Sequence, residues 1–102
     1  MIATVEELLR SIEGEEMPPE ELDQILRALW FTKKGDWEQA HTIVQDIETQ
    51  LGCWIHALLH VIEGDQWNAD YWFSRANRPK RGPGQVDEEW IAIAKFALGE
   101  EP

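Results

Sequence analysis

Apolar residues recur along most of the chain at intervals of three and four positions, which is the spacing of one face of an α-helix. The first such stripe follows Thr4, and Glu7 three residues later completes the pattern of a capping box. Gly14 ends the stripe, so we expect a short first helix between Thr4 and Gly14. The apolar members of this stripe are Val5, Leu8, Leu9 and Ile12.

Pro18 and Pro19 block continuation of the first helix and suit the first turn of a second one. The acidic residues that follow favour the same helix end, because the helix dipole is positive there. We therefore expect a second helix that begins at the prolines and lasts to about Lys33. The acidic residues are Glu20, Glu21 and Asp23, and the apolar stripe consists of Leu22, Ile25, Leu26 and Leu29.

Gly35 supplies a left-handed residue that ends the second helix, and Asp36 can cap a third, with Gln39 at the reciprocal capping position. We expect this third helix to continue until Gly52 interrupts it. The next stretch, 53–62, is apolar on nearly every side, which is typical of a helix covered by neighbours all round. The stripe of the third helix is Ala40, Ile43, Val44 and Ile47.

Gly64 and Asp65 repeat the same stop-and-cap pattern before a fifth helix. A loop with two prolines and two glycines follows at 77–85, and a last helix is expected at about 87–98. No segment reads as a strand, so the sequence predicts an all-α single domain, 1–102, of about six helices. The last two helices have the stripes Ala69, Trp72, Phe73 and Ala76, and Trp90, Ile93, Ala94 and Ala97.

A six-residue motif occurs twice, as Gly-Asp-Trp-Glu-Gln-Ala at 35–40 and as Gly-Asp-Gln-Trp-Asn-Ala at 64–69, a spacing of 29 positions. The motif resembles the start of the second helix of tetratricopeptide repeats, Gly-Asp-Tyr-Glu-x-Ala, although that family has a period of about 34 residues. The resemblance covers roughly 22–79 and implies antiparallel hairpins in a right-handed stack, with the first and last helices as caps. The matched positions are Ala28, Gly35, Ala40 and Val44 in the first copy, and Ala57, Gly64, Ala69, Phe73 and Ala76 in the second.

The segment 54–79, which contains the runs WIHALLH, EGD and YWFSRANRP, is also similar to a segment of small, largely uncharacterised bacterial proteins. That similarity implies no activity. The tetratricopeptide resemblance implies that an inner face, formed by the first helix of each hairpin, accepts a peptide or a protein. In this chain the face would consist of Leu22, Ile25, Leu26, Leu29, Lys33, Trp54, Ile55, Leu58 and Ile62.

Composition narrows the classes of function. The formal net charge at pH 7 is −11, so a protein that coats nucleic acid is not expected. The single cysteine, Cys53, cannot form an intrachain disulfide, which favours a reducing compartment, and we expect the cytoplasm. No apolar segment approaches the roughly 18 residues of a membrane span, and the N-terminus lacks the pattern of an export signal, so no membrane association is expected.

His56, His60 and Glu63 are spaced by four and three positions on the predicted central helix and therefore share one face. Two imidazoles one turn apart and a carboxylate could ligate a metal ion, so metal binding or enzymatic chemistry at these residues is one alternative. The interpretation we favour is structural, with both rings packed and hydrogen-bonded between helices. His41 is expected to flank the core and would join the ligands only in the alternative.

Four of the nine Lys and Arg residues lie at one helix end and in the following loop, beside Tyr71 and Trp72. Cations beside aromatic rings can bind phosphate, a nucleic-acid strand or an acidic peptide, so an anion or nucleic-acid module is a second alternative. The favoured interpretation is that they complement a helix dipole and solubilise the loop, with Arg75 paired to Glu63 or Asp70. The four cations are Arg75, Arg78, Lys80 and Arg81.

Eight acidic residues and one basic residue, Arg10, lie between Glu6 and Asp23. Most are expected on outward faces, as an ordinary solvated surface. Opposite charges at the two ends of the chain could also steer self-association, in which the acidic end of one copy meets the 78–81 loop of another.

Nucleophilic catalysis finds no support in the sequence, because Cys53 lies on an apolar helix and Ser74 lacks the GxSxG context. We therefore expect a non-catalytic module without a cofactor, which binds a protein, a peptide or a second copy. No metal site belongs to this preferred interpretation. The candidate binding residues are Trp54, His56, His60, Glu63, Tyr71, Trp72, Arg75, Arg78, Lys80 and Arg81.

Overall fold

The computed structural model describes residues 2–100, which form six α-helices and one short 3-10 helix and contain no strand. The prediction of an all-α chain of six helices is therefore confirmed. The elements are α1 (Val5–Gly14), α2 (Gln24–Lys34), α3 (Trp37–Val44), α4 (Gln50–Glu63), α5 (Gln66–Arg75), η1 (Pro83–Gln85) and α6 (Val86–Leu98).

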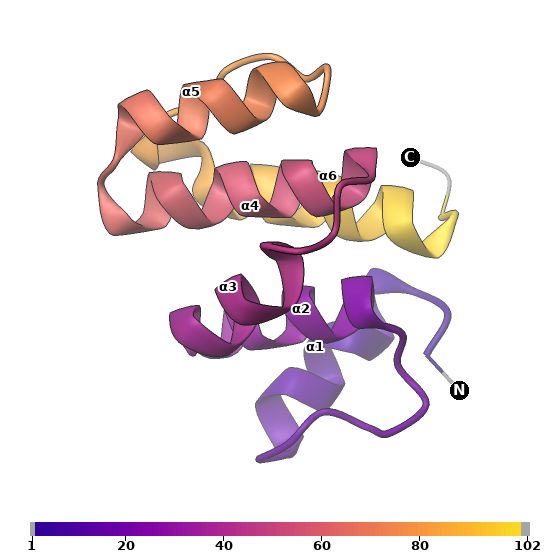
Figure 1. The fold of residues 1–102 in the computed structure, drawn as a ribbon. Coiled ribbons are helices and arrows are strands. Elements are labelled where there is room, and N and C mark those ends of the chain that lie inside the picture. Colours follow the sequence, from indigo (N-terminus) through magenta and orange to yellow (C-terminus); the bar gives the residue numbers. More distant parts are fainter. Residues whose placement is uncertain (1, 101–102) are drawn as a thin grey trace.

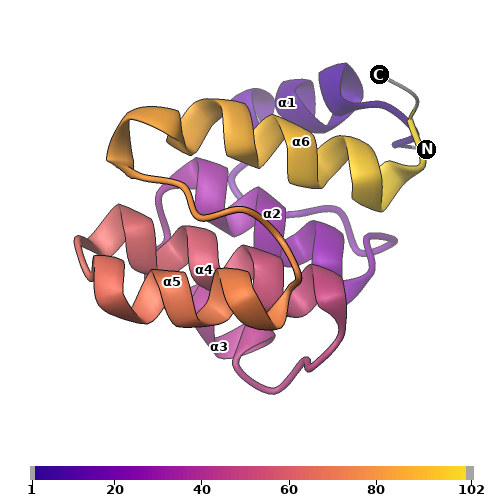
Figure 2. The same ribbon diagram turned by 90° about the horizontal axis from the view of Figure 1, so that it is seen from above.

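Helix α4 lies at the centre of the fold. It packs against α5, its hairpin partner, and also against α2, α3 and α6 (Figures 1 and 2). Every residue from 52 to 61 is buried, which agrees with the apolar character of this stretch on all sides. Helices α2 and α3 form the other hairpin, and α1 covers α2 and α6. No helix in the described part of the chain is long and apolar enough to cross a bilayer.

The two Gly–Asp corners have nearly the same geometry. Gly35 and Gly64 adopt left-handed conformations, with φ of 96° and 90°. At each corner the amide of the aspartate donates to the carbonyl five residues earlier at 2.9 Å, which closes the end of the preceding helix. The carboxylate then accepts the amide three residues later at 3.2 Å and so begins the next helix. The corners are therefore equivalent joints.

The predicted start of α2 was too early. The helix begins at Gln24, because the carboxylate of Asp23 accepts the amide of Leu26 at 2.9 Å and caps the first turn. Pro19 lies instead in a preceding turn, in which its carbonyl accepts the amide of Leu22. Leu22 is buried as expected, but from the connection rather than from the helix.

The predicted end of α3 was too late, and Gly52 has a different role from the one expected. Helix α3 ends at Val44, Ile47 lies in the connection, and Thr49 caps α4. Gly52 lies inside the first turn of α4, where a Cβ atom would stand 2.3 Å from the carbonyl oxygen of Ile47. Glycine is therefore required because the connection passes directly over this turn.

The inner faces of the two hairpins are covered by the chain's own last helix, since α6 packs on both α2 and α4. Trp90 Nε1 donates to the carbonyl of Leu29 at 3.0 Å, and Trp54 Nε1 donates to Glu89 Oε2 at 2.7 Å. Both bonds are buried. The centre of the face to which the resemblance assigned a peptide groove is therefore part of the hydrophobic core.

We predict that Gly52→Ala destabilises the protein by about 2 kcal/mol, because the new methyl group meets backbone that cannot rotate away. Urea unfolding followed by circular dichroism measures the change. Gly14→Ala is the matched control, since nothing lies within 4 Å of its added Cβ, and its stability should stay within about 1 kcal/mol of the wild type. Equal effects of the two substitutions would contradict the assigned role of Gly52.

Candidate functional site

Three histidines meet between the hairpins, one from α3 and two from α4. The ligand nitrogens of His41, His56 and His60 all lie within 4.8 Å of one another. The ring centroid of His56 lies 4.8 Å from that of His41 and 4.9 Å from that of His60. We call these three residues the histidine cluster.

Two tryptophans enclose the histidine cluster. The ring of His41 stacks on Trp37 at 4.6 Å, and the ring of His56 stacks on Trp72 at 4.0 Å, with interplanar angles of 10° and 14°. Trp37 is itself fixed, because its Nε1 donates to the carbonyl of Leu59 at 2.7 Å. These stacks hold two of the three imidazoles in defined orientations.

The two histidines of α4 differ in their hydrogen bonds. His60 is 6% exposed, and its Nδ1 lies 2.6 Å from Glu63 Oε2. Because an ionised carboxylate only accepts, this bond places a proton on Nδ1 and leaves Nε2 of neutral His60 without one. His56 is 5% exposed, and its buried Nδ1 has no hydrogen-bond partner among the described residues. An unsatisfied buried nitrogen beside two other imidazoles calls for an explanation.

The surroundings favour neutral rings. The pKa of His56 is lowered from 6.5 to about 4, mainly because the ring is buried. The positive charges that His60 and His41 carry when protonated lower it further. Burial also lowers the pKa of His41, with His60 adding to the effect and Glu63 opposing it. At neutral pH both imidazoles therefore retain a free lone pair.

The residues that the structure brings together differ from the set expected from the sequence. His60 and Glu63 contact each other, as their spacing predicts, but Glu63 groups with His60 and Asp65 rather than with His56. His41, which we expected at the edge of the core, is the third member of the histidine cluster. The signal for it was the four-residue spacing from Trp37, which places both rings on the face of α3 that packs against α4.

Two of the predicted basic residues hold the loop to the core. The guanidinium of Arg78 lies 4.1 Å from the ring centroid of Trp54, and Arg81 Nε lies 3.2 Å from Glu89 Oε1. Trp54, a candidate binding residue, is buried and is satisfied by the same Glu89 carboxylate. The sequence did not predict that Glu89 is buried, because only the tertiary fold brings Trp54 of α4 and Arg81 of the loop to its carboxylate.

The other two basic residues remain nearer to solvent. Arg75 covers the ring of Tyr71, and its expected pairing with Glu63 or Asp70 is wrong, since the carboxylate within reach is Glu48, at 3.9 Å. Helix α5 turns Arg75 toward the α3–α4 connection, which carries Glu48. Lys80 is exposed in the loop. The four cations therefore do not converge on one anion site.

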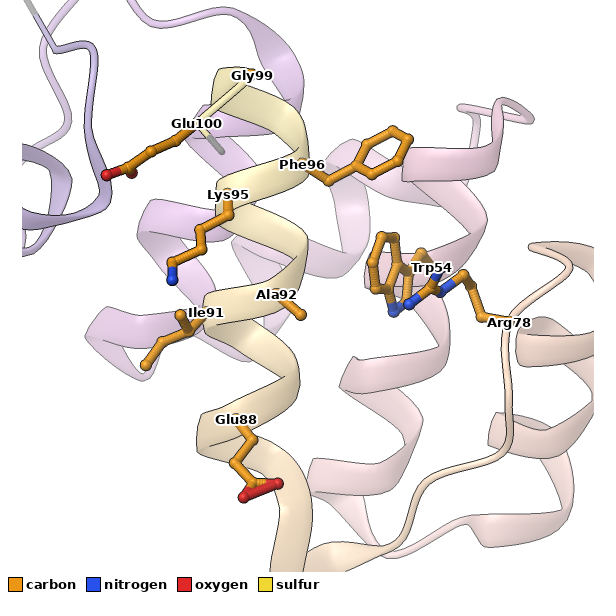
Figure 3. Close-up of a pocket in the computed structure, with 9 residues that line it drawn as sticks. All are labelled: Trp54, Arg78, Glu88, Ile91, Ala92, Lys95, Phe96, Gly99 and Glu100. Atoms are coloured by element: carbon orange, nitrogen blue, oxygen red, sulfur yellow. The ribbon is translucent and has the colours of Figure 1, made fainter. Parts of the chain in front are cut away.

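A surface groove of about 590 Å³ runs along α6 beside α4. Figure 3 shows Arg78 lying against Trp54, with Ala92 and Phe96 of α6 facing them. The carboxylate of Glu100 points away, toward the start of α1, where it accepts the amide of Val5 at 2.9 Å. No sequence pattern predicts this groove, because the outward residues of α6 carry no distinctive motif.

Comparison of the chain with protein-family models, with curated proteins and with solved structures finds no match. Among the described residues, the histidine cluster combines three imidazoles from two helices, two of them with lowered pKa values, with a buried nitrogen that lacks a partner.

We predict that the protein loses stability as the pH falls from 6.5 toward 4, by about 3 kcal/mol from His56 alone. The pKa of this group is depressed in the fold, so the unfolded chain takes up the proton first. The contribution is complete above pH 6.5 and is lost as the pH approaches the folded pKa. Chemical unfolding at a series of pH values, with a chelator present, measures it.

His56→Phe is the matched variant, since it keeps an aromatic ring against Trp72 but cannot titrate. The variant lacks this proton-binding group, so the difference between the two pH profiles reports His56 together with its coupling to His41 and His60. Parallel profiles between pH 6.5 and 4 would show that His56 carries no depressed pKa.

Proposed function

We propose that the protein binds a divalent transition-metal ion of the zinc class through His41, His56 and His60. The observation that carries this proposal is the separation of at most 4.8 Å among their ligand nitrogens. In a tetrahedral zinc site the nitrogens lie about 3.3 Å apart, as follows from Zn–N distances of about 2.0–2.1 Å. The nitrogens must therefore close by up to about 1.5 Å, and the stacked rings of His56 and His60 must also turn so that a nitrogen of each points to the same ion.

The protonation state of the cluster supports the proposal. Metal binding requires imidazole in its neutral form, and burial already lowers the pKa values of His41 and His56. No proton has to be removed from these two rings at neutral pH. The unpartnered Nδ1 of His56 would gain a partner on metal binding.

Glu63 supports the proposal from outside the ligand set. Histidine ligands of metals commonly donate their second ring nitrogen to a carboxylate, which fixes the tautomer and raises the basicity of the ligand. The 2.6 Å contact between His60 Nδ1 and Glu63 Oε2 is such an arrangement. Imidazole ligands suit zinc, cobalt, nickel and copper. Which of these ions is bound therefore depends on the affinity of the site for each ion and on the availability of the ion.

We predict that the protein, purified without an affinity tag and freed of metal by a chelator, binds one Zn²⁺ per chain with a dissociation constant in the micromolar range or below. Isothermal titration calorimetry measures the stoichiometry, and absorption of the Co²⁺ complex reports the ligands. His41→Phe, which keeps the stack on Trp37, should weaken binding at least tenfold.

Cys53→Ser is the control for this experiment, since the buried thiol lies outside the histidine cluster and its removal should leave Zn²⁺ affinity unchanged. Exposed carboxylates could also take up zinc, but they would do so equally in His41→Phe. The proposal fails if the wild type binds no Zn²⁺ or if the affinity is the same without His41.

Three expectations from the sequence are kept as proposals. The hairpins are tetratricopeptide-like repeats, a proposal that the equal geometry of the two Gly–Asp corners supports. The protein is of bacterial type, which the similarity of 54–79 supports. It resides in a reducing compartment such as the cytoplasm, which the single free Cys53 supports.

A further inference from the structure

Arg78 carries a guanidinium group that has no polar partner among the described residues. Its buried Nε makes no hydrogen bond, and its side chain forms no ion pair. Each of the other arginines lies within 3.3 Å of a carboxylate, hydroxyl or carbonyl oxygen. Buried Glu89 does not serve Arg78, because its two oxygens contact Trp54 Nε1 and Arg81 Nε. A partly buried cation without an acceptor is a position at which the acceptor of a ligand is expected.

Arg78 is held in place by its backbone and by its side chain. Asn77 adopts a left-handed conformation, with φ of 58°, just after the end of α5. The amide of Arg78 then donates to the carbonyl of Phe73 at 3.0 Å and closes the helix end. The guanidinium lies 4.1 Å from the ring centroid of Trp54, a cation–π contact. The group is therefore oriented before a ligand arrives, which reduces the entropy lost on binding.

The groove beside Arg78 has an apolar opposite wall. Ala92 and Phe96 of α6 form this wall and face the Arg78 side chain in Figure 3. The ring of Phe96 is 56% exposed, and its centroid lies 5.9 Å from that of Trp54. Small-molecule sites typically combine apolar walls with a few polar groups that orient the ligand. This groove therefore suits a ligand that joins an aromatic ring to an acceptor for the guanidinium.

The other charges that line the groove restrict the charge of the ligand. Glu100 is engaged by the amide at the start of α1, and Lys95 extends away from Arg78 in Figure 3. Glu88 is exposed at one end of the groove and repels a second negative charge. A ligand with one negative charge therefore fits, whereas a phosphate polymer is also repelled by the net charge of −11.

We propose that the groove between α4 and α6 binds a small aromatic carboxylate. The carboxylate accepts two hydrogen bonds from Nη1 and Nη2 of Arg78, whose planar fork matches its geometry. The aromatic ring of the ligand packs on Ala92 and Phe96. This inference is independent of the proposed metal function, because no member of the histidine cluster lines the groove.

The probe is 2-naphthoate, and the matched control ligand is 2-naphthamide, which keeps the rings but carries no charge. Two-dimensional NMR of ¹⁵N-labelled protein at pH 7 follows both titrations, with a chelator present so that bound metal does not contribute. We expect saturable shifts at the amides of α6 and at the indole N–H of Trp54, with a dissociation constant of about 1 mM or below. The amide should bind at least about tenfold more weakly, because it cannot form the charged pair.

Arg78→Gln should weaken binding of 2-naphthoate at least about tenfold and leave binding of 2-naphthamide unchanged. Arg75→Gln is the matched control, since it removes an arginine that does not line the groove and should leave both affinities unchanged. Arg78→Lys keeps a charge without the planar fork and should give an intermediate affinity. Circular dichroism and thermal unfolding show whether each variant is folded, and Arg78→Lys serves as the test if Arg78→Gln is not.

The proposal is overturned if 2-naphthoate causes no saturable shift up to its solubility limit, or if the acid and the amide bind equally well. Unchanged affinity for the acid in folded Arg78→Gln, or in Arg78→Lys, would overturn it as well. Sedimentation velocity tests the other occupant, a second copy of the chain. A dimer that Phe96→Ala dissociates would assign the groove to self-association and not to a carboxylate.

Discussion

The complete burial of α4 is the constraint on which the rest of the structure depends. A helix without a solvent face needs neighbours on every side, and α2, α3, α5 and α6 supply them. Any polar side chain on its buried length must find its partners inside the protein. His56 and His60 are the polar side chains in this position, and the flanking helices meet them with the rings of Trp37, His41 and Trp72.

The repeated corner explains where those rings lie. Both Gly–Asp joints turn the following helix back with the same geometry, so α3 packs on α2 as α5 packs on α4, and α3 also contacts α4 from the neighbouring hairpin. The tryptophan of the motif is displaced by one position between the copies, at 37 and 67, and one position turns a side chain by about 100° around a helix. Trp37 accordingly packs on His41, whereas Trp67 is directed to solvent. The same type of joint thus places one tryptophan against the histidine cluster and the other on the surface.

The sequence predicted the helices because their signals are local: spacing, caps and left-handed glycines. It placed helix ends wrongly where one residue type can have two structural roles. Gly52 suggested a helix end, but it is needed to admit the carbonyl of Ile47. Asp23 suggested a charge within the first turn, but it is the cap that precedes it.

The membership of the candidate site depended on pairings between helices, which local patterns do not contain. The sequence placed His56, His60 and Glu63 on one face, but it could not show that α3 brings His41 to them. Burial of Glu89 depends in the same way on Trp54 and on Arg81 from the loop. Helix α6, which carries Glu89, also packs on the inner face of the two hairpins. Local patterns do not place α6 there, so the sequence alone suggested an open groove.

Zinc binding by the histidine cluster can be observed in a crystal structure of the protein grown with Zn²⁺, with diffraction recorded on both sides of the zinc absorption edge. We expect one anomalous peak between α3 and α4, about 2.0–2.1 Å from a ring nitrogen of each of His41, His56 and His60, with Glu63 still bonded to His60. A structure in which the three rings point apart, or in which zinc binds only exposed carboxylates, would contradict it.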